Sequence, residues 1–94
     1  MIRVLIERHL QEGAERALHL AMREMRQEAM PWPGYISGET LRDAANPRRY
    51  IIVSTWRSRA DWDAWAASAE RRQIEDKIAP LLTKPETATV LEPV

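Results

Sequence analysis

The sequence predicts an α+β fold with a ferredoxin-like order of elements, β-α-β-β-α(α)-β, and three observations support it. Short β-branched runs alternate with stretches of helical period. Their order is the split βαβ pattern, in which helices cover one face of an antiparallel sheet. The run at residues 49–56 carries large apolar side chains on both faces of the predicted strand. We therefore expect a second protomer on the open face, so that two sheets close a dimeric α+β barrel.

The first half of the chain changes from strand to helix periodicity. Residues 2–10 predict a strand with two distinct faces, one formed by Ile2, Val4 and Ile6 and the other by Arg3, Leu5, Glu7 and His9. Residues 14–29 predict a helix whose apolar stripe consists of Ala14, Ala17, Leu18, Ala21, Met22 and Met25. The segment MPWPG at residues 30–34 ends this helix, because neither proline can continue it.

The second half predicts two strands, a broken helix and a last strand. Residues 35–44 and 49–56 form the strands, joined by a turn that contains Asn-Pro. Ser58, with Asp61 three positions later, predicts a helix N-cap. Ile74 lies more than about 100° out of phase with the preceding tryptophans, so we expect a break near Ser68 and a second helix ending before Pro80. Residues 86–94 close the sheet.

The composition excludes several classes of function. The chain has 94 residues, of which 14 are basic and 14 acidic, so it has no positive surplus for binding nucleic acid. It contains no cysteine, and His9 and His19 lack the spacing of a helical metal pair. The apolar run at residues 1–6 is too short to span a membrane. We expect one cytoplasmic domain over residues 1–94, without a metal.

The candidate binding residues are mostly tryptophans. Trp62 and Trp65 share a helix face and either pack on the sheet or line a site. Trp62 falls in the first turn, where we expect water to reach its ring, whereas Trp65 lies a turn deeper beside small residues that leave room for a flat ligand. Trp32, between two prolines, is either a lid or an interface anchor. Met22 and Met25 line a pocket or fill the core.

Candidates for a catalytic base are few. His9 ends the first strand on the face assigned to the dimer, and His19 lies about 120° from the centre of the first helix's apolar stripe. Glu39 projects from a strand and acts as a base only if it is buried. No nucleophile motif, phosphate loop or carboxylate pair accompanies them.

The segment from Pro33 to Ile74, PGYISGETLRDAANPRRYIIVSTWRSRADWDAWAASAERRQI, resembles the antibiotic biosynthesis monooxygenase family. The matching features are Pro-Gly-Tyr before the second strand, Asn-Pro before the third, and the block SRADWDAWAAS after it. This resemblance implies a dimeric barrel. Members of that family include cofactor-independent oxygenases of polyketide anthrones and quinols, haem-degrading enzymes, and many proteins with no established role.

The haem-degrading branch of the family can be tested at three positions. Its pattern requires an asparagine on the first strand, a tryptophan on the helix after the third strand, and a histidine ten residues later. Trp65 fits, but Ile6 and Glu75 stand at the other two positions. A carboxylate is a poor axial ligand for haem, so we expect neither haem nor another cofactor.

The sequence thus predicts a homodimeric, cofactor-independent monooxygenase-like protein that acts on a small phenolic, anthrone or quinol-like molecule. Its aromatic pocket would lie between the helices and the sheet. The residues expected to bind the substrate are Trp65, Trp62, Trp32, Met22, Met25 and Ile6. The alternative is a non-catalytic dimeric module that binds a small hydrophobic metabolite or regulates a pathway enzyme.

Overall fold

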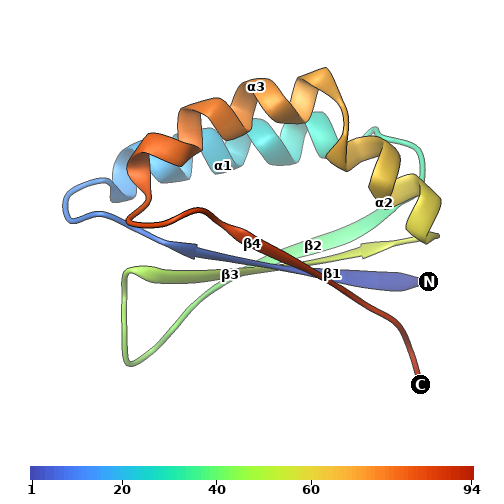
Figure 1. The fold of residues 1–94 in the computed structure, drawn as a ribbon, viewed down its shortest axis with the longest axis horizontal. Helices are drawn as coiled ribbons and strands as arrows, with labels where there is room; N and C mark the ends of the chain where they lie inside the picture. Colours follow the sequence, from blue (N-terminus) through green and yellow to red (C-terminus); the bar gives the residue numbers. More distant parts are fainter.

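The chain forms one antiparallel sheet with a layer of helices on one face (Figure 1). The computed structural model describes all residues, 1–94. In chain order the elements are β1 (Ile2–His9), α1 (Glu15–Ala29), β2 (Tyr35–Arg42), β3 (Arg49–Trp56), α2 (Arg59–Ala66), α3 (Ala69–Ile78), a 3₁₀ turn (Ala79–Leu81) and β4 (Thr87–Leu91). This order confirms the predicted ferredoxin-like fold.

The sheet has the strand order β2-β3-β1-β4. In the central pair, Val4 lies opposite Ser54 and Ile6 opposite Ile52, so the even-numbered residues of both strands share one face. That face is buried under the helices, with Val4 fully inaccessible. The alternation predicted for β1 and β3 is therefore confirmed, because a strand's side chains alternate between the two faces of its sheet.

Helices α1 and α3 lie side by side over the sheet, and their apolar residues complete the core. Leu18, Ile74 and Ile78 are almost inaccessible to solvent. The stripe predicted for α1 is wrong at Ala17, which is exposed. Ala14 packs against the core as predicted, but it is the N-cap residue, so the helix begins one residue later than predicted. The bounds of the last strand are also corrected, because β4 begins at Thr87 and ends at Leu91.

The break between α2 and α3 lies where the periodicity predicts it. Ser58 caps α2 by accepting a hydrogen bond from the Asp61 backbone N–H at 3.2 Å. Ser68 caps α3 by accepting from the Arg71 backbone N–H at 3.1 Å, and its hydroxyl also donates to the Trp65 carbonyl at 2.7 Å. One serine therefore joins the end of α2 to the start of α3. The change of helix direction lets both helices turn their large side chains towards the sheet.

Gly34 fixes where α2 begins relative to the sheet. Its φ of +86° favours glycine, and a side chain there would overlap the Asp61 side chain. Its carbonyl accepts a hydrogen bond from the Arg57 backbone N–H at 2.8 Å. The chain entering β2 thus lies against the first turn of α2, and this contact brings the tryptophans of α2 over the sheet.

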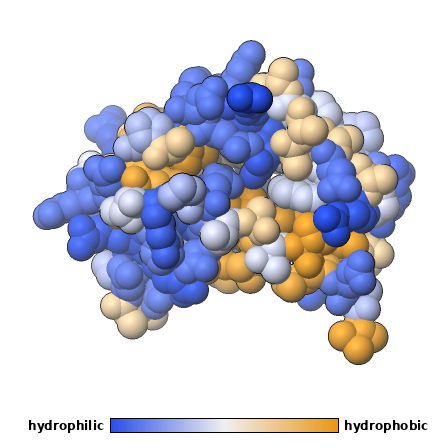
Figure 2. Space-filling view, viewed as in Figure 1, coloured by the Kyte–Doolittle hydropathy of each residue, from blue (hydrophilic) through white to orange (hydrophobic).

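The other face of the sheet has no cover in the single chain (Figure 1). Leu5, Ile51 and Val53 are half-buried there, while Leu41 and Leu91 are 46% and 43% exposed. Figure 2 shows apolar surface along the lower side of the molecule, where Figure 1 places the strands. None of the helices has the length and apolar character needed to cross a bilayer.

Candidate functional site

A pocket lies between the helical layer and the sheet. Its cavity volume is about 100 Å³, and nine of its sixteen lining residues are hydrophobic. Strands β1, β2 and β3 supply one wall, and the three α-helices supply the other. Five of the residues predicted to bind a substrate border it: Ile6, Met22, Met25, Trp62 and Trp65. Their binding role remains a prediction.

Packed aromatic rings form part of the pocket wall. Trp56 at the end of β3 contacts Tyr35 and Trp62 edge to face, with ring centroids 5.4 and 5.7 Å apart. It stacks against Trp65 at 6.4 Å and 24°. The Trp56 indole N–H donates to the Ser54 hydroxyl at 3.0 Å. That bond fixes the central ring, on which the other aromatic rings pack.

The two tryptophans of α2 are both buried, with Trp62 6% and Trp65 3% exposed. The expectation that water reaches the Trp62 ring is wrong, because the Arg71 guanidinium of α3 covers it with Cζ 5.2 Å from the ring centroid. Trp32 does not line the pocket. It packs against Trp65 at 5.1 Å and so supports the wall from behind.

Two buried arginines border the same pocket. Arg8 of β1 is 2% exposed and Arg71 of α3 is 6% exposed. Both donate to Glu86, Arg8 through Nε to Oε1 and Arg71 through Nη2 to Oε2, each at 3.2 Å. Arg71 also pairs through Nη1 with Glu75. One carboxylate is therefore shared by two guanidinium groups, and neither glutamate lines the pocket.

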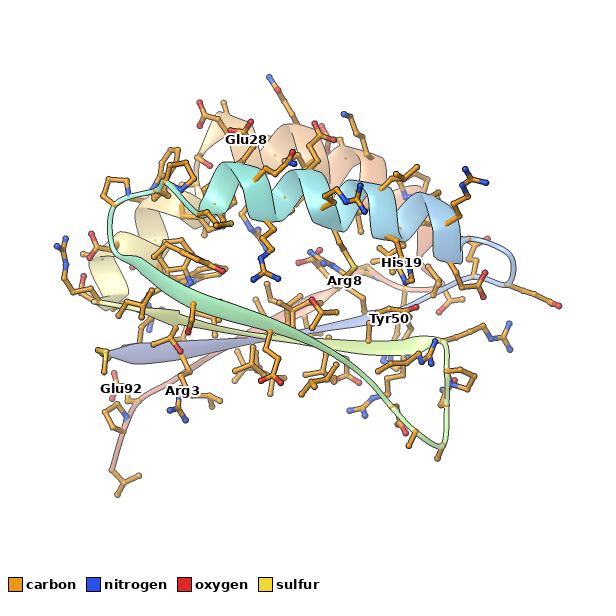
Figure 3. All side chains as sticks on the ribbon, turned by 180° about the vertical axis from the view of Figure 1, so that it is seen from behind. Arg3, Arg8, His19, Glu28, Tyr50 and Glu92 are labelled. Carbon is orange, nitrogen blue, oxygen red and sulfur yellow. The ribbon has the colours of Figure 1, made fainter.

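Arg8 keeps free donors on its pocket side. Its Nε bond to Glu86 is its one side-chain hydrogen bond, so Nη1 and Nη2 have no protein acceptor. No fully buried side-chain nitrogen or oxygen in the structure lacks a partner. The two terminal nitrogens therefore keep some accessible surface, and Arg8 is one of the residues that line the pocket. Figure 3 shows Arg8 between the helical layer and the sheet. Burial lowers the pKa of Arg8, an effect that Glu86 opposes, but arginine stays protonated.

Tyr35 brings a hydroxyl group to the pocket wall. Its Oη lies against Gly38 of β2, where a Cβ atom would come within 2.6 Å. Both residues line the pocket. The glycine therefore leaves room for the phenol ring, which the edge-to-face contact with Trp56 holds in place.

The three candidates for a base lie away from the pocket interior. His9 lies on the open face of the sheet, where its Nε2 is 2.9 Å from Glu7 Oε1. His19 of α1 does not line the pocket; its Nε2 is 2.9 Å from the Tyr50 hydroxyl (Figure 3). Glu39 borders the pocket, but its register opposite Val53 puts its side chain on the open face, and it is exposed.

A charged chain runs across one end of the open face. Arg49 donates through Nε to Glu7 at 2.6 Å and through Nη1 to Asp43 at 3.1 Å. The Arg49 hydrogen bond, followed by that of His9, holds the pKa of Glu7 below its usual value. The pKa of Asp43 is also lowered, mainly by the hydrogen bond from the Ala45 backbone N–H. His9 therefore belongs to a surface network.

The pocket lacks the histidine that the haem-degrading pattern requires, and the chain holds no cluster of side chains that could bind a metal ion. No group of three or more histidine, cysteine, aspartate or glutamate side chains could hold a metal ion. Glu75, at the position where the haem-degrading pattern requires histidine, is paired with Arg71 and lies outside the pocket. Neither histidine borders the pocket.

The sequence reasoning did not single out Arg8, Arg71 or Tyr35. A signal for Arg8 was present, because it has the same parity in β1 as the buried residues Ile2, Val4 and Ile6. Arg71 lies three positions before Ile74 on one helix face, which also indicates burial. Glu86, the shared partner, is 78 residues from Arg8, and no local pattern connects them.

Comparisons with known proteins agree with this architecture. The family described as antibiotic biosynthesis monooxygenase matches residues 1–77. Protein SchA of Streptomyces halstedii is 27% identical over 79 residues, which are 84% of this chain and 21% of SchA. The chain thus spans about a fifth of that relative.

Solved structures share the fold at low identity. A conserved protein from Methanosarcina mazei superposes with a TM-score of 0.91 at 15% identity, covering 97% of this chain and 90% of that chain. A mutant of SnoaB, a cofactor-independent oxygenase from Streptomyces nogalater, gives 0.87 at 10% identity, covering 98% and 91%.

The fold and the pocket define a ferredoxin-like α+β protein with a pocket of aromatic and basic residues beneath its helices. The chain belongs to the antibiotic biosynthesis monooxygenase family.

Proposed function

We propose that the protein is a cofactor-independent monooxygenase that acts on a small phenolic, anthrone or quinol-like molecule. The observation that carries the proposal is the pocket wall formed by Trp56, Trp62 and Trp65. Indole rings offer a flat ligand stacking and edge contacts over a large apolar area. The family and the description of SnoaB as a cofactor-independent oxygenase are consistent with it.

The chemistry requires no external reductant. When the CH₂ group of an anthrone becomes a C=O group, the substrate supplies four electrons. Dioxygen accepts all four, since one oxygen atom enters the product and the other leaves as water with the two hydrogens. The protein needs only to bind the ring, exclude water and favour loss of the first proton.

Oxygen consumption with a panel of anthrones and hydroquinones tests the proposal. We expect the protein to accelerate uptake at least several-fold over the uncatalysed rate with one or more of them. With ¹⁸O₂, the anthraquinone should carry one labelled oxygen atom, and buffer and unfolded protein are the controls. If the anthrones or hydroquinones bind but oxygen uptake is not accelerated, the protein is the non-catalytic module of the alternative hypothesis. The lack of a histidine inside the pocket favours that alternative.

A further inference from the structure

Arg8 is a buried cation whose own surroundings neutralise it only in part. It shares the half-buried Glu86 carboxylate with Arg71, so two buried positive charges meet one negative charge. The second carboxylate, Glu75, bonds Arg71 alone and has a side chain that is 33% exposed. Burying a charge is costly unless hydrogen bonds and opposite charge compensate it. Glu86 compensates part of the charge, but the two terminal nitrogens of Arg8 have no hydrogen-bond acceptor in the protein.

The positive groups of this cluster border the pocket, and the negative groups lie outside its lining. The two guanidinium groups border the pocket, whereas Glu75 and Glu86 do not. The exposed Arg26 of α1 adds a third positive side chain to the lining. The one acidic lining residue, Glu39, directs its side chain to the other face of the sheet. A ligand in the pocket therefore meets positive charge in front of the carboxylates.

Arg71 is held in place on this wall. Its guanidinium lies over the Trp62 ring, which favours a cation at that position. Glu75 and Glu86 each occupy one of its terminal nitrogens. Arg71 thus orients the cluster, while Arg8 has the two donors that remain free.

We propose that Arg8 is the binding residue for a negatively charged oxygen on a planar aromatic ligand, with the ring against Trp62 and Trp65. The inference deepens the proposed function, on which it rests for the ring. Two parallel N–H donors match the lone pairs of an oxyanion, and such charge-assisted bonds are strong. Binding the anion in preference to the neutral molecule lowers the pKa of the bound substrate. This accounts for a site without a histidine or a carboxylate side chain directed into the pocket.

A matched pair of ligands tests the inference by titration calorimetry. The compound 2-hydroxy-1,4-naphthoquinone is an anion at neutral pH, whereas its 2-methoxy ether is neutral and similar in shape. We expect wild type to bind the anion about tenfold or more tightly than the ether, which equals about 1.4 kcal/mol. A tenfold preference would lower the pKa of a bound hydroxyl by about one unit.

Three variants assign the preference to Arg8. Arg8→Met keeps apolar volume and should reduce the preference to about twofold or less, while affinity for the ether stays within about threefold. Arg8→Lys keeps the charge without the planar donors and should retain an intermediate preference. Arg16→Met removes an exposed charge from α1 and should leave both affinities unchanged. If Arg8→Met does not fold, Arg8→Met with Glu86→Gln removes the paired charges together.

Three results would overturn the inference: equal binding or no binding of the two ligands by wild type, an anion preference that survives in the Arg8 variants, or equal loss of both ligands. Equal loss of affinity for both ligands would show that Arg8 maintains the structure of the pocket and does not bind the anion. Oxygen uptake measured in parallel separates the two proposals. If the protein accelerates oxygen uptake but shows no preference for the anionic ligand, the oxyanion site is rejected and the oxygenase proposal stands. If the preference depends on Arg8 but oxygen uptake is not accelerated, only the oxygenase proposal is rejected.

Discussion

Trp65 borders the pocket on one side and contacts two other indoles on the other. It lines the pocket, stacks on Trp56 and supports Trp32. Its indole N–H has no protein acceptor, and since every fully buried polar side-chain atom has a partner, that N–H faces open space. Truncation to alanine would cost about 3–5 kcal/mol and would confuse folding with binding. Phenylalanine is the sharper probe because it keeps most of the apolar area.

We expect Trp65→Phe to weaken binding of a two- or three-ring phenol at least several-fold while the melting temperature changes by only a few degrees. Trp32→Phe is the matched control, because Trp32 touches Trp65 but does not line the pocket. Titration calorimetry and thermal unfolding of both variants check this prediction. If both changes prove harmless to a ligand that wild type binds, the indoles serve packing alone.

The Glu7 carboxylate gives stability a defined pH dependence. Arg49 and His9 lower its pKa in the folded protein, so folding favours the ionised form. The stabilisation is present above the ordinary carboxyl pKa of about 4.3 and is lost as the pH falls through the lower, folded value. Asp43 and Asp61 have lowered pKa values and contribute with the same sign.

We therefore expect the melting temperature to fall as the pH is lowered below about 4. Arg49→Met should flatten part of this decline, because it removes the bond that contributes most to the Glu7 shift. Arg48→Met, at the neighbouring exposed position, is the control. Unfolding scans from neutral to acid pH measure the effect. An identical decline in Arg49→Met and wild type would exclude this network as its source.

At the scale of elements, the corner between α2 and α3 joins two helices that both contribute side chains to the pocket wall. Ser68 caps α3 and bonds the last turn of α2. We expect Ser68→Ala to lower the free energy of unfolding by about 1 kcal/mol, the usual cost of a lost N-cap. Ser68→Asn, which restores a cap acceptor, should recover most of that loss. Chemical denaturation measures both changes. If Ser68→Ala leaves the free energy of unfolding unchanged, packing alone determines the break between α2 and α3.

The elements that sequence reasoning located well are those with local causes. Alternation fixed the faces of β1 and β3, and Ser58 and Ser68 marked the helix starts, because a cap joins residues two or three positions apart. The Asp61 side chain near Gly34 and the Arg71 side chain over Trp62 are contacts between different elements. Periodicity carries no record of such contacts. The sequence pattern therefore predicted that the Trp62 ring was exposed to solvent, and it gave no sign that Arg8 and Arg71 share the Glu86 carboxylate.

At the scale of the whole molecule, we propose that a second copy of the chain covers the open face of the sheet. Leu5, Ile51 and Val53 are adjacent on the two central strands of that face. An apolar area of this kind marks an interaction surface. A domain of this size also buries only about 60–65% of its unfolded surface, so association would add stability.

We expect light scattering coupled to size exclusion to give twice the chain mass of 10.9 kDa at micromolar concentration. Val53→Arg places a charge in the centre of the face and should shift the protein towards the monomer, whereas Ala45→Arg in the exposed β2–β3 turn should not. A mass of one chain throughout the micromolar range would contradict the proposed dimer.

The tryptophan cluster has an optical consequence. All four indoles of the chain lie in one series of contacts, from Trp32 through Trp65 and Trp56 to Trp62, with neighbouring centroids 5.1 to 6.4 Å apart. At such distances the electronic transitions couple, so the far-ultraviolet circular dichroism should contain an exciton couplet superimposed on the backbone signal. Excitation absorbed by one ring will also migrate among the others before emission. Any movement of α2 over the sheet would then change the couplet without an added label.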